Sequence, residues 1–405
     1  MLDIKYIRQF PGLVQEKIAQ KGSKVDINEL LALDEKRRAG MQEIEALRAS
    51  RKKSEASTDE AREAKASLKN LEEELKIINA EFMRLMRELP NLPVDGWLVG
   101  TSEADNRMVR EVGEKRNFSF TPKDYLTLAT QLGIIDMERG AKVSGSRMGY
   151  IKGKLAQLEF ALVSYAFEVL SPEGFTHIVP PVMVKPEMME AMGFIDKGDE
   201  DVYKLERDNM YLVGTSEQSV VPMHADEVFK AEDLPRRYGS FSTCFRREAG
   251  SYGKDTKGIL RVHQFDKVEM LSFTTPENSL HEHEFLVGLA EKLMISLKIP
   301  YRLMQLSTGD ISRPSAGTYD IESWMPGTGT YRETHSISTT TDYQARRLNI
   351  KYDAGAKKEY VHILNGTAFA IQRMLITIIE NYQQEDGSIA VPEVLQKYLG
   401  FDRIN

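Results

Sequence analysis

Two arginines and a glutamate stand together in residues 244–250, which read CFRREAG, and an aromatic residue follows at Phe265. The guanidinium groups of Arg246 and Arg247 match phosphate oxygens in a bidentate way. The carboxylate of Glu248 can accept a hydrogen bond from an exocyclic amine, and the Phe265 ring offers a face for a base. The segment therefore predicts a nucleotide site, and the alternative is a solvated strand surface or an ion pair.

Two strands joined by a long polar loop are needed to position these residues. Phe245 before the loop, and Phe265, Val268 and Met270 after it, supply strand-like apolar positions. Residues 251–255 within the loop read SYGKD and are rich in turn formers. We therefore expect the charged side chains to lie at the strand ends.

A second candidate segment, residues 214–217, reads GTSE. The hydroxyl of Thr215 and the carboxylate of Glu217 can hold an ammonium group through charge-assisted hydrogen bonds. The same residues are also typical of an ordinary helix N-cap. Both interpretations stay open at this point.

Two further segments carry groups suited to phosphates and metal ions. Residues 331–336 read YRETHS, and a carboxylate such as Glu333 together with phosphates is what Mg²⁺ prefers. Residues 364–373 read LNGTAFAIQR and predict a strand and an Asn-Gly turn that enters an apolar helix. Arg373, just inside that helix, would reach a phosphate while its stem packs on apolar groups. The alternatives are an edge-strand charge for Glu333 and a surface residue for Arg373.

Composition limits the class of protein. A chain of 405 residues favours two domains, and a net charge of −7 argues against a broadly basic nucleic-acid coat. Cys244 is the only cysteine, which excludes a disulfide framework and a cysteine-based zinc cluster. The sequence has no apolar stretch long enough to span a bilayer and begins with no secretory signal. We expect a cytoplasmic location.

The N-terminal region predicts an antiparallel helical hairpin. In its second half, apolar residues alternate three and four apart, as a coiled-coil seam requires: Leu68, Leu71, Leu75, Ile78, Phe82, Leu85 and Leu89. The partner helix is expected over about 27–54, Ser57 and Glu60 form a candidate capping box, and residues 90–93 (PNLP) end the hairpin. A basic tip near the turn suits contact with nucleic-acid phosphates: Arg48, Arg51, Lys52 and Lys53. The alternative is a dimerisation or spacer coil.

Taken in order, these segments resemble the motifs of class II aminoacyl-tRNA synthetases, and in detail those of the seryl-tRNA synthetase family. Residues 174–181 (GFTHIVPP), after a helix expected over about 156–170, resemble motif 1. Residues 244–269 resemble motif 2 and residues 364–373 motif 3. Residues 214–217, 318–322, 331–336, 341–349 and 380–395 also match. The resemblance thus covers nearly the whole chain.

This resemblance implies an α+β fold, in which an antiparallel-sheet class II synthetase catalytic domain follows an N-terminal antiparallel two-helix coiled-coil arm. The implied domains are a tRNA-binding domain over 1–97 and a catalytic domain over 98–405. The arm would cover about 27–89, with its tip at about 48–60. Motif 1 further implies a homodimer.

The implied activity is serine–tRNA ligation. L-serine would be activated with ATP to seryl-adenylate and passed to the 3′ end of tRNA(Ser), with tRNA(Sec) as a second acceptor. Mg²⁺ bound with ATP by Glu333 and Ser336 is the implied metal. We expect no zinc, no membrane partner and no DNA partner.

The resemblance also assigns residues to roles. Arg246, Arg373 and Glu333 are the implied catalytic residues. Serine is expected to contact Thr215, Ser216, Glu217, Glu269, Thr367 and Asn365. ATP is expected to contact Arg246, Arg247, Glu248, Arg261, Val262, Phe265, Glu333, Thr334, His335, Ser336 and Arg373. The tRNA is expected to contact Arg48, Arg51, Lys52 and Lys53.

The chain departs from the family pattern at several positions, namely Ser216, Gly317, His335 and Gln372, and its arm is shorter than the usual bacterial one. One alternative function is therefore a catalytically inactive paralogue that acts as an RNA-binding or scaffold protein. A second alternative is a ligase that loads a carrier protein. The helical arm and the lone Cys244 argue against the second, because such relatives lack the arm and use zinc-binding cysteines.

Overall fold

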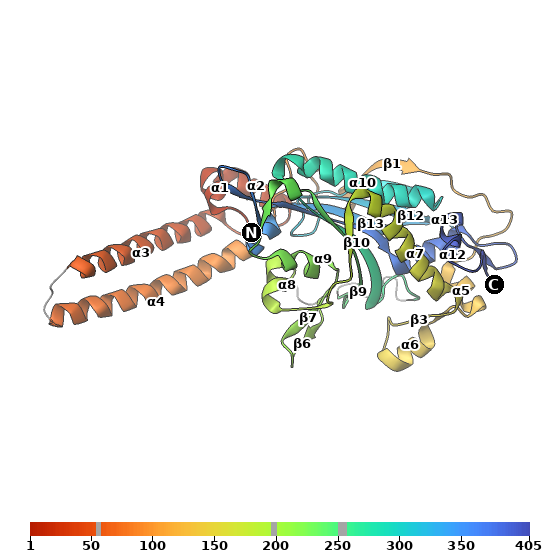
Figure 1. Cartoon of the computed structure of the whole chain (residues 1–405), viewed down its shortest axis with the longest axis horizontal. Helices are drawn as coiled ribbons and strands as arrows, with labels where there is room; N and C mark the ends of the chain where they lie inside the picture. The colour runs from red at the N-terminus through yellow and green to blue at the C-terminus, as the bar shows by residue number, and fades with distance from the viewer. Residues whose placement is uncertain (54–57, 196–200, 250–256) are drawn as a thin grey trace. The chain divides into compact units, whose positions relative to one another are not determined.

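The computed structural model describes residues 1–53, 58–195, 201–249 and 257–405, and the side chains of residues 50–64 are outside the description. The chain forms two compact units, Met1–Leu92 and Pro93–Asn405, where the sequence predicts 1–97 and 98–405. Figure 1 shows the helices and strands of each unit. Over the described residues, no helix combines the length and apolar character needed to cross a membrane.

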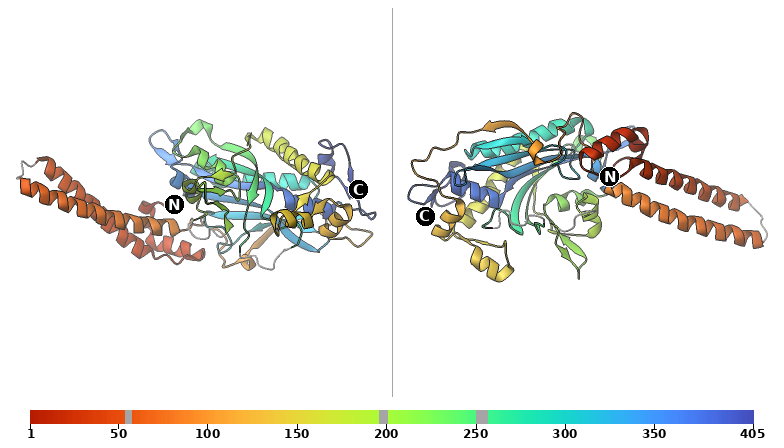
Figure 2. Two further views of the ribbon diagram at one scale, coloured as in Figure 1. Left: turned by 90° about the horizontal axis from the view of Figure 1, so that it is seen from below. Right: turned by 180° about the vertical axis from the view of Figure 1, so that it is seen from behind.

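The first unit is helical. Its helices are α1 (Ile4–Gln9), α2 (Pro11–Gln20), α3 (Ile27–Lys53) and α4 (Thr58–Glu88). Helices α3 and α4 lie side by side in every view and form the expected arm (Figure 2). Along the predicted seam of α4, Phe82 and Leu85 are buried, whereas Leu68 and Leu71 are half-buried. The arm is therefore packed most tightly toward the end of α4. The candidate capping residue Ser57 lies outside the described residues.

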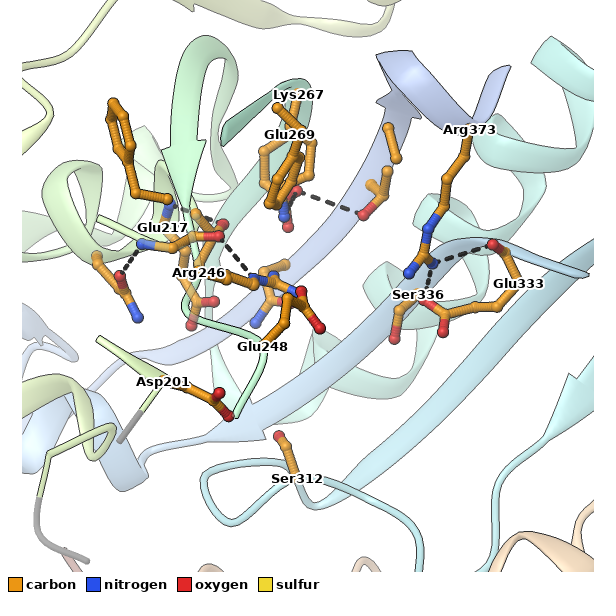
Figure 3. A pocket seen from close by; sticks show the side chains of 18 of the residues that line it. Asp201, Glu217, Arg246, Glu248, Lys267, Glu269, Ser312, Glu333, Ser336 and Arg373 are labelled. Carbon is orange, nitrogen blue, oxygen red and sulfur yellow. Dashed lines mark hydrogen bonds and ion pairs between the residues drawn. The ribbon is translucent and has the colours of Figure 1, made fainter. Parts of the chain in front are cut away.

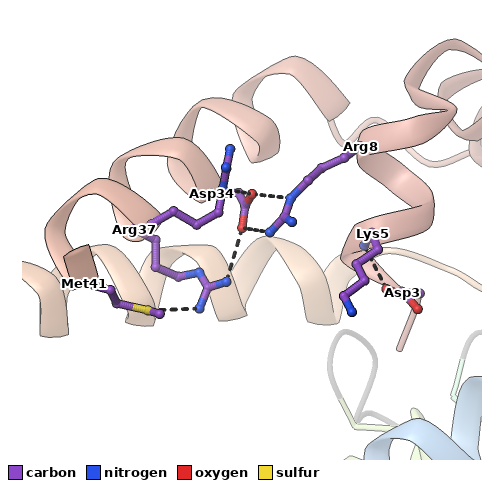
Figure 4. Close-up of polar contacts among 7 residues, drawn as sticks. Asp3, Lys5, Arg8, Asp34, Arg37 and Met41 are labelled. Carbon is purple, nitrogen blue, oxygen red and sulfur yellow. Dashed lines mark hydrogen bonds and ion pairs between the residues drawn. The ribbon is translucent and has the colours of Figure 1, made fainter. Parts of the chain in front are cut away.

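A buried carboxylate ties α1 to α3. Asp34 is 1% exposed, and its oxygens accept hydrogen bonds from Arg8 at 2.7 and 3.0 Å, from Arg37 at 3.2 Å and from Arg38 at 3.1 Å (Figure 4). Burial alone would raise the pKa of Asp34, but the hydrogen bonds from Arg8 and Arg37 hold it below its usual value. The carboxylate thus stays charged and joins two helices that are far apart in sequence.

The second unit is built on one large sheet. Its strands, in spatial order, are β1 (Arg107–Val112), β11 (Tyr301–Gln305), β12 (Gly317–Met325), β13 (Thr330–Thr341), β16 (His362–Ala370), β10 (Gln264–Thr274), β9 (Arg236–Phe245) and β4 (Phe175–Ile178). Every neighbouring pair is antiparallel except β4 with β9. The predicted α+β class with an antiparallel sheet is confirmed.

Helices pack around this sheet, and small sheets surround it. The helices are α5 (Tyr125–Leu132), α6 (Met137–Ser144), α7 (Lys154–Leu170), α8 (Pro186–Met192), α9 (Glu217–Val220), α10 (Ser279–Ser296), α11 (Tyr343–Leu348), α12 (Ile371–Asn381) and α13 (Glu393–Gln396). The short strands are β2 (Ile135–Asp136), β3 (Tyr150–Ile151), β5 (Met183–Val184), β6 (Lys204–Leu205), β7 (Met210–Leu212), β8 (Val228–Lys230), β14 (Lys351–Asp353), β15 (Lys358–Tyr360), β17 (Ile389–Ala390) and β18 (Arg403–Ile404). Helix α10 packs against β13 and β16 (Figure 1).

Residues that the sequence assigns to a turn lie inside a central strand. Asn365 and Gly366 pair with Leu271 and Met270 of β10, so the expected Asn-Gly turn is wrong. The glycine is explained by packing instead, because a Cβ on Gly366 would lie 3.0 Å from a methyl group of Ile337. Tertiary pairing has overridden a local turn signal.

The Trp97 ring occupies the space that a side chain at Gly317 would need. A Cβ at this position would lie 2.9 Å from the Trp97 ring. The ring is held from other sides too, because its Nε1 donates to the Leu306 carbonyl at 2.9 Å and its face stacks near His283. The first residue of β12 is therefore fixed as glycine by what packs on it.

Replacing Asp34 with asparagine should destabilise the N-terminal unit. The variant loses a charge that several arginines surround, and hydrogen bonds to charged groups contribute about 1.5–3 kcal/mol each to stability. We expect the free energy of unfolding to fall by about 2 kcal/mol in urea titrations followed by circular dichroism.

The matched control is Glu81→Gln, which removes an exposed partner of Arg84 and should cost no more than about 1 kcal/mol. Equal losses in the two variants would contradict the structural role of Asp34.

Candidate active site

One cavity of about 450 Å³ in the second unit gathers most of the predicted residues. Its wall includes Thr215, Glu217, Arg246, Glu248, Arg261, Val262, Phe265, Glu269, Glu333, Thr334, Ser336, Asn365, Thr367 and Arg373. In Figure 3, Glu217, Lys267 and Glu269 lie on one side of the hollow, Glu333, Ser336 and Arg373 on the other, and Arg246 and Glu248 between them.

Strand alternation explains why these side chains meet. Phe265, Lys267 and Glu269 are alternate residues of β10, and successive side chains of a strand point to opposite faces. Asn365 and Thr367 of β16 repeat the pattern. Intervening residues such as Val268 and Ala368 belong to the hydrophobic core. One face of the sheet thus presents polar side chains to the cavity, and the other face packs into the hydrophobic core.

Arg246 is held in place at the end of β9. Its Nε donates to the Gly214 carbonyl at 3.1 Å, and its backbone N donates to the His263 carbonyl at 3.0 Å. The guanidinium carbon lies 5.2 Å from the centre of the Phe265 ring, within cation–π distance. The terminal nitrogens of a side chain fixed through Nε are presented to the cavity in a defined orientation.

Glu248 and Arg261 flank the same region. They form an ion pair at 3.1 Å, and both line the cavity. Glu248 has a φ of 53°, the left-handed region that non-glycine residues adopt at a cost of roughly 1–3 kcal/mol. Strain of this kind is concentrated at functional sites.

Arg373 and Glu333 form a second charged pair at the opposite end. Arg373 Nη1 lies 2.9 Å from a carboxylate oxygen of Glu333 and 3.0 Å from its carbonyl oxygen. Burial would raise the pKa of Glu333, but the charges of Arg373, Arg246 and Arg261 lower it below its usual value. Glu333 is therefore an anion at neutral pH.

Asp320 lies beside this pair without a predicted role. It is opposite Ser336 in the β12–β13 ladder, and burial together with the Glu333 charge raises its pKa well above the usual value. Its Oδ1 atom is buried and has no hydrogen-bond partner among the described residues. Two neighbouring carboxyl groups thus have pKa values shifted in opposite directions: the pKa of Asp320 is raised and that of Glu333 is lowered.

The other end of the cavity contains two buried glutamates. Glu217 is 4% and Glu269 is 2% exposed. Glu269 forms an ion pair with Lys267, and Thr367 Oγ1 donates to Glu269 Oε2 at 3.5 Å. Burial raises the pKa of Glu217 to about 7, with the Glu269 charge adding to the rise and a hydrogen bond from Gln344 opposing it.

Glu217 belongs to a helix terminus as well as to the cavity. It is the first residue of α9, Ser216 is the N-cap, and the Thr215 hydroxyl accepts from the Glu217 backbone N at 3.3 Å. The Ser216 side chain makes no capping hydrogen bond. The two interpretations of residues 214–217 are therefore compatible.

Three predicted residues lie outside the cavity wall. Ser216 is fully buried, and within the described part of the chain its hydroxyl has no hydrogen-bond partner. Arg247 donates through Nε to the Val202 carbonyl at 3.1 Å and lies over the Tyr203 ring. His335 follows the strand alternation away from Ser336 and is hydrogen-bonded to Ala368 O at 2.9 Å. Burial lowers the pKa of His335 to about 4, so the ring is neutral.

The predicted basic tip belongs to the first unit. Arg48 is exposed and forms an ion pair with Glu72 at 2.7 Å. The side chains of Arg51, Lys52 and Lys53 lie outside the described part of the chain.

Some cavity residues have no counterpart in the prediction. Lys267 is 7% exposed and could have been found from the alternation of β10. Gln372 also lines the wall, and its Oε1 accepts from the Asp266 backbone N at 2.8 Å, so its bulk is accommodated. Asp201, Ser312 and Ser315 line the cavity from loops, and no periodic signal in the sequence marks them.

The donor set suits a magnesium ion better than zinc. Glu333 and Ser336 both line the cavity and offer hard oxygen atoms, to which a bound polyphosphate would add its own. Over residues 1–53, 58–195, 201–249 and 257–405, no group of three or more His, Cys, Asp or Glu side chains is arranged to hold a metal ion. The two oxygen donors of Glu333 and Ser336 fit an ion whose other ligands come from a bound phosphate.

The cavity thus joins two kinds of binding chemistry. Arg246, Arg261 and Arg373 can hold a polyanion beside an aromatic face. Glu217 and Glu269 can hold an ammonium group and a hydroxyl. A ligand pair that combines a nucleotide with an amino acid matches this arrangement.

Comparison with known proteins identifies the family. Residues 1–93 match the model of the seryl-tRNA synthetase N-terminal domain, and residues 203–382 match that of the tRNA synthetase class II core domain (G, H, P, S and T). A serine–tRNA ligase of Exiguobacterium sibiricum is 43% identical, with 99% of this chain and 98% of that protein covered. The chain belongs to the seryl-tRNA synthetase family. Family members are aminoacyl-tRNA ligases, so the chain is an enzyme of that class.

Solved structures of the family agree in fold. The seryl-tRNA synthetase of Pyrococcus horikoshii, complexed with ATP, has a TM-score of 0.93 and 39% identity, and the match covers 100% of this chain and 99% of that one. The cytoplasmic serine–tRNA ligase of Naegleria fowleri, in complex with AMP, has a TM-score of 0.91 and 33% identity over 100% and 99% of the two chains. The predicted family and class II fold are confirmed.

Replacing Lys267 with methionine should strongly destabilise the second unit. The variant leaves the buried carboxylate of Glu269 without its cation, which costs about 3–5 kcal/mol when a buried pair is broken. Urea unfolding followed by tryptophan fluorescence measures the loss.

The double variant Lys267→Met with Glu269→Gln should recover most of that stability, because no buried charge is then unpaired. As a control, Lys298→Met breaks an exposed pair with Glu393 and should cost no more than about 1 kcal/mol. A double variant as unstable as the single one would contradict this account.

Proposed function

We propose that this chain ligates L-serine to tRNA(Ser) in two steps, with ATP as the activating substrate. The observation that carries the proposal is the single cavity in which three arginines face a nucleotide-sized space and two buried glutamates face its far end. Both steps are acyl or phosphoryl transfers in which positioning and charge stabilisation dominate.

In the first step, a carboxylate oxygen of serine attacks the α-phosphorus of ATP. The bond from that phosphorus to the bridging oxygen breaks, and pyrophosphate leaves with the electron pair. Arg246 is proposed to bridge the α-phosphate and the serine carboxylate, because its guanidinium is fixed through Nε between the two halves of the cavity. It would stabilise the charge that spreads over the phosphoryl oxygens.

The rest of the nucleotide would be held by neighbouring residues. The adenine ring is proposed to stack on Phe265, with Glu248 accepting from its amino group. Arg373 is proposed to hold the γ-phosphate, for which it must exchange Glu333 for phosphate as its partner. Arg261, Val262 and Thr334 complete the proposed ATP contacts from the cavity wall.

Magnesium is proposed to be held by Glu333 and Ser336. When bound with ATP, the ion would neutralise phosphate charge and fix the conformation of the triphosphate. The low pKa of Glu333, in which arginine charges outweigh burial, keeps the carboxylate ionised for this purpose.

Serine would occupy the far end of the cavity. Thr215 and Glu217 are proposed to take the α-ammonium group, and Glu269 and Thr367 the side-chain hydroxyl, with Asn365 beside them. Because Glu269 is buried, alanine would leave its hydrogen-bonding capacity unmet and should be rejected strongly.

In the second step, the 3′-hydroxyl of the terminal adenosine of the tRNA attacks the carbonyl carbon of seryl-adenylate. The acyl–phosphate bond breaks and AMP leaves. The basic tip of the arm is proposed to contact the tRNA through its phosphates. Selenocysteine tRNA as a second acceptor stays a prediction.

We also propose a homodimer and a cytoplasmic location. The side chains of Phe160 and Val179 are 65% and 73% exposed, and the segment over 156–181 resembles motif 1. Exposed apolar side chains of this size support a protein interface.

Replacing Arg246 with alanine should reduce serine-dependent ATP–pyrophosphate exchange by about a hundredfold to a thousandfold, since one charge-stabilising donor is lost from the transition state. The control Arg236→Ala removes an arginine from the other end of β9 and should leave exchange unchanged. Near-normal exchange in Arg246→Ala would refute the proposed bridging role.

Replacing all four tip residues (Arg48, Arg51, Lys52 and Lys53) with alanine should weaken tRNA binding without affecting pyrophosphate exchange. Each phosphate contact contributes about 0.7–0.9 to the slope of log K against log salt, so the slope should fall by up to about 3. Filter-binding titrations at several salt concentrations measure it. Removing Lys357 and Lys358 from the second unit serves as the control, and an equal loss there would contradict the tip's role.

A further inference from the structure

Gln344 contacts the cavity through Glu217 rather than directly. It is the second residue of α11 and is fully buried. Its Nε2 donates to Glu217 Oε1 at 2.7 Å and lies 3.5 Å from the Met192 carbonyl oxygen. The Thr340 hydroxyl lies 3.0 Å from its Oε1 and 2.9 Å from the Ile363 carbonyl oxygen, and it can donate to one of them at a time.

These partners allow the amide only one orientation. The Glu217 carboxylate and the Met192 carbonyl are both acceptors, so the amide nitrogen must face them. If the amide were turned over, its oxygen would face two acceptors in a buried place, and its nitrogen would face the hydroxyl of Thr340. When Glu217 is ionised, Gln344 therefore presents a donor to it.

The charges around Glu217 oppose one another. Glu269 disfavours its ionised form, as burial does, whereas Lys267 and Arg246 favour it. The Gln344 hydrogen bond is the strongest of the influences that favour the carboxylate. Because an ionised carboxylate accepts about four hydrogen bonds, one amide on Oε1 leaves capacity for a cationic ligand.

We infer that Gln344 is a positioning residue for the amino acid: it orients Glu217 and keeps it anionic, so that the α-ammonium group of serine can bind. This inference rests on the proposed function and deepens it. A purely structural role for Gln344, as a brace between α11 and α8, would affect stability alone.

The test is the pH dependence of kcat/KM for serine in pyrophosphate exchange. In the unmodified enzyme, KM for serine should rise as the pH falls below about 7, because burial raises the pKa of Glu217 to about 7 and only its ionised form binds an ammonium group. Gln344→Met keeps the volume but removes the donor, so the anion is less favoured. The acid limb should move up by about one pH unit, with KM for ATP unchanged.

Thr340→Val supplies a second variant in case Gln344→Met does not fold. It removes the hydroxyl that lies 3.0 Å from Gln344 Oε1 and should shift the acid limb in the same direction by a smaller amount. Tyr343→Phe is the matched control, because its hydroxyl, on the same helix, contacts Arg347 at 2.8 Å and not the cavity. Its acid limb should coincide with that of the unmodified enzyme.

The outcomes separate the two proposals. An acid limb that stays in place in both Gln344→Met and Thr340→Val, whatever happens to melting temperature or kcat, overturns the positioning role. A limb that also moves in Tyr343→Phe does the same, because the shift would then report general disturbance of α11. Absence of serine-dependent exchange in the unmodified enzyme would instead overturn the proposed function.

Discussion

Charges that are withheld from water must be balanced, and the cavity of the catalytic unit is organised around that requirement. The buried Glu269 is paired with Lys267, and the more accessible Glu248 and Glu333 face Arg261 and Arg373. An unpaired buried charge would cost several kcal/mol or would be removed by a change of protonation state. Glu217 illustrates the change of protonation state, because burial raises its pKa to about 7.

The same balance suggests how ligands exchange with internal partners. In the proposed function, a phosphate that reaches Arg373 would replace the carboxylate of Glu333, which would then be available to a cation. An ammonium group bound at Glu217 would supply the positive charge that this buried carboxylate needs in order to stay ionised. Binding would then substitute one neutral arrangement for another, which would keep the electrostatic cost of ligand binding small.

The polar residues of the motifs could be predicted from the sequence because their chemistry is recognisable one residue at a time. Arg246, Glu248 and Phe265 were expected at a nucleotide site, and they line one cavity. Lys267 is harder to predict although the alternation of β10 includes it, because a lysine that follows an aspartate is typical of a solvated strand face. Gln344 could not have been found from the sequence, since its importance comes from one hydrogen bond to a residue distant in the chain.

The error at Asn365 and Gly366 has a different origin. An Asn-Gly pair usually signals a turn, but here β10 and β13 pair with both sides of the strand, and the Ile337 side chain packs closely on Gly366. Local propensity describes an isolated segment, whereas a central strand is selected by its neighbours. A glycine can be required by a turn or by close packing, and only the arrangement of the sheet shows that packing is the reason at Gly366.

The indole of Trp97 rests on Gly317 and so joins the start of this unit to a strand far along its sequence. A lysine at 317, which the family resemblance leads us to expect, could enter this chain only if Trp97 moved or were exchanged for something smaller. Either substitution alone should destabilise the unit, because a lysine at 317 would collide with the Trp97 ring and a smaller residue at 97 would leave a void. The two positions are therefore coupled, so the double substitution should cost less stability than the sum of the two single ones.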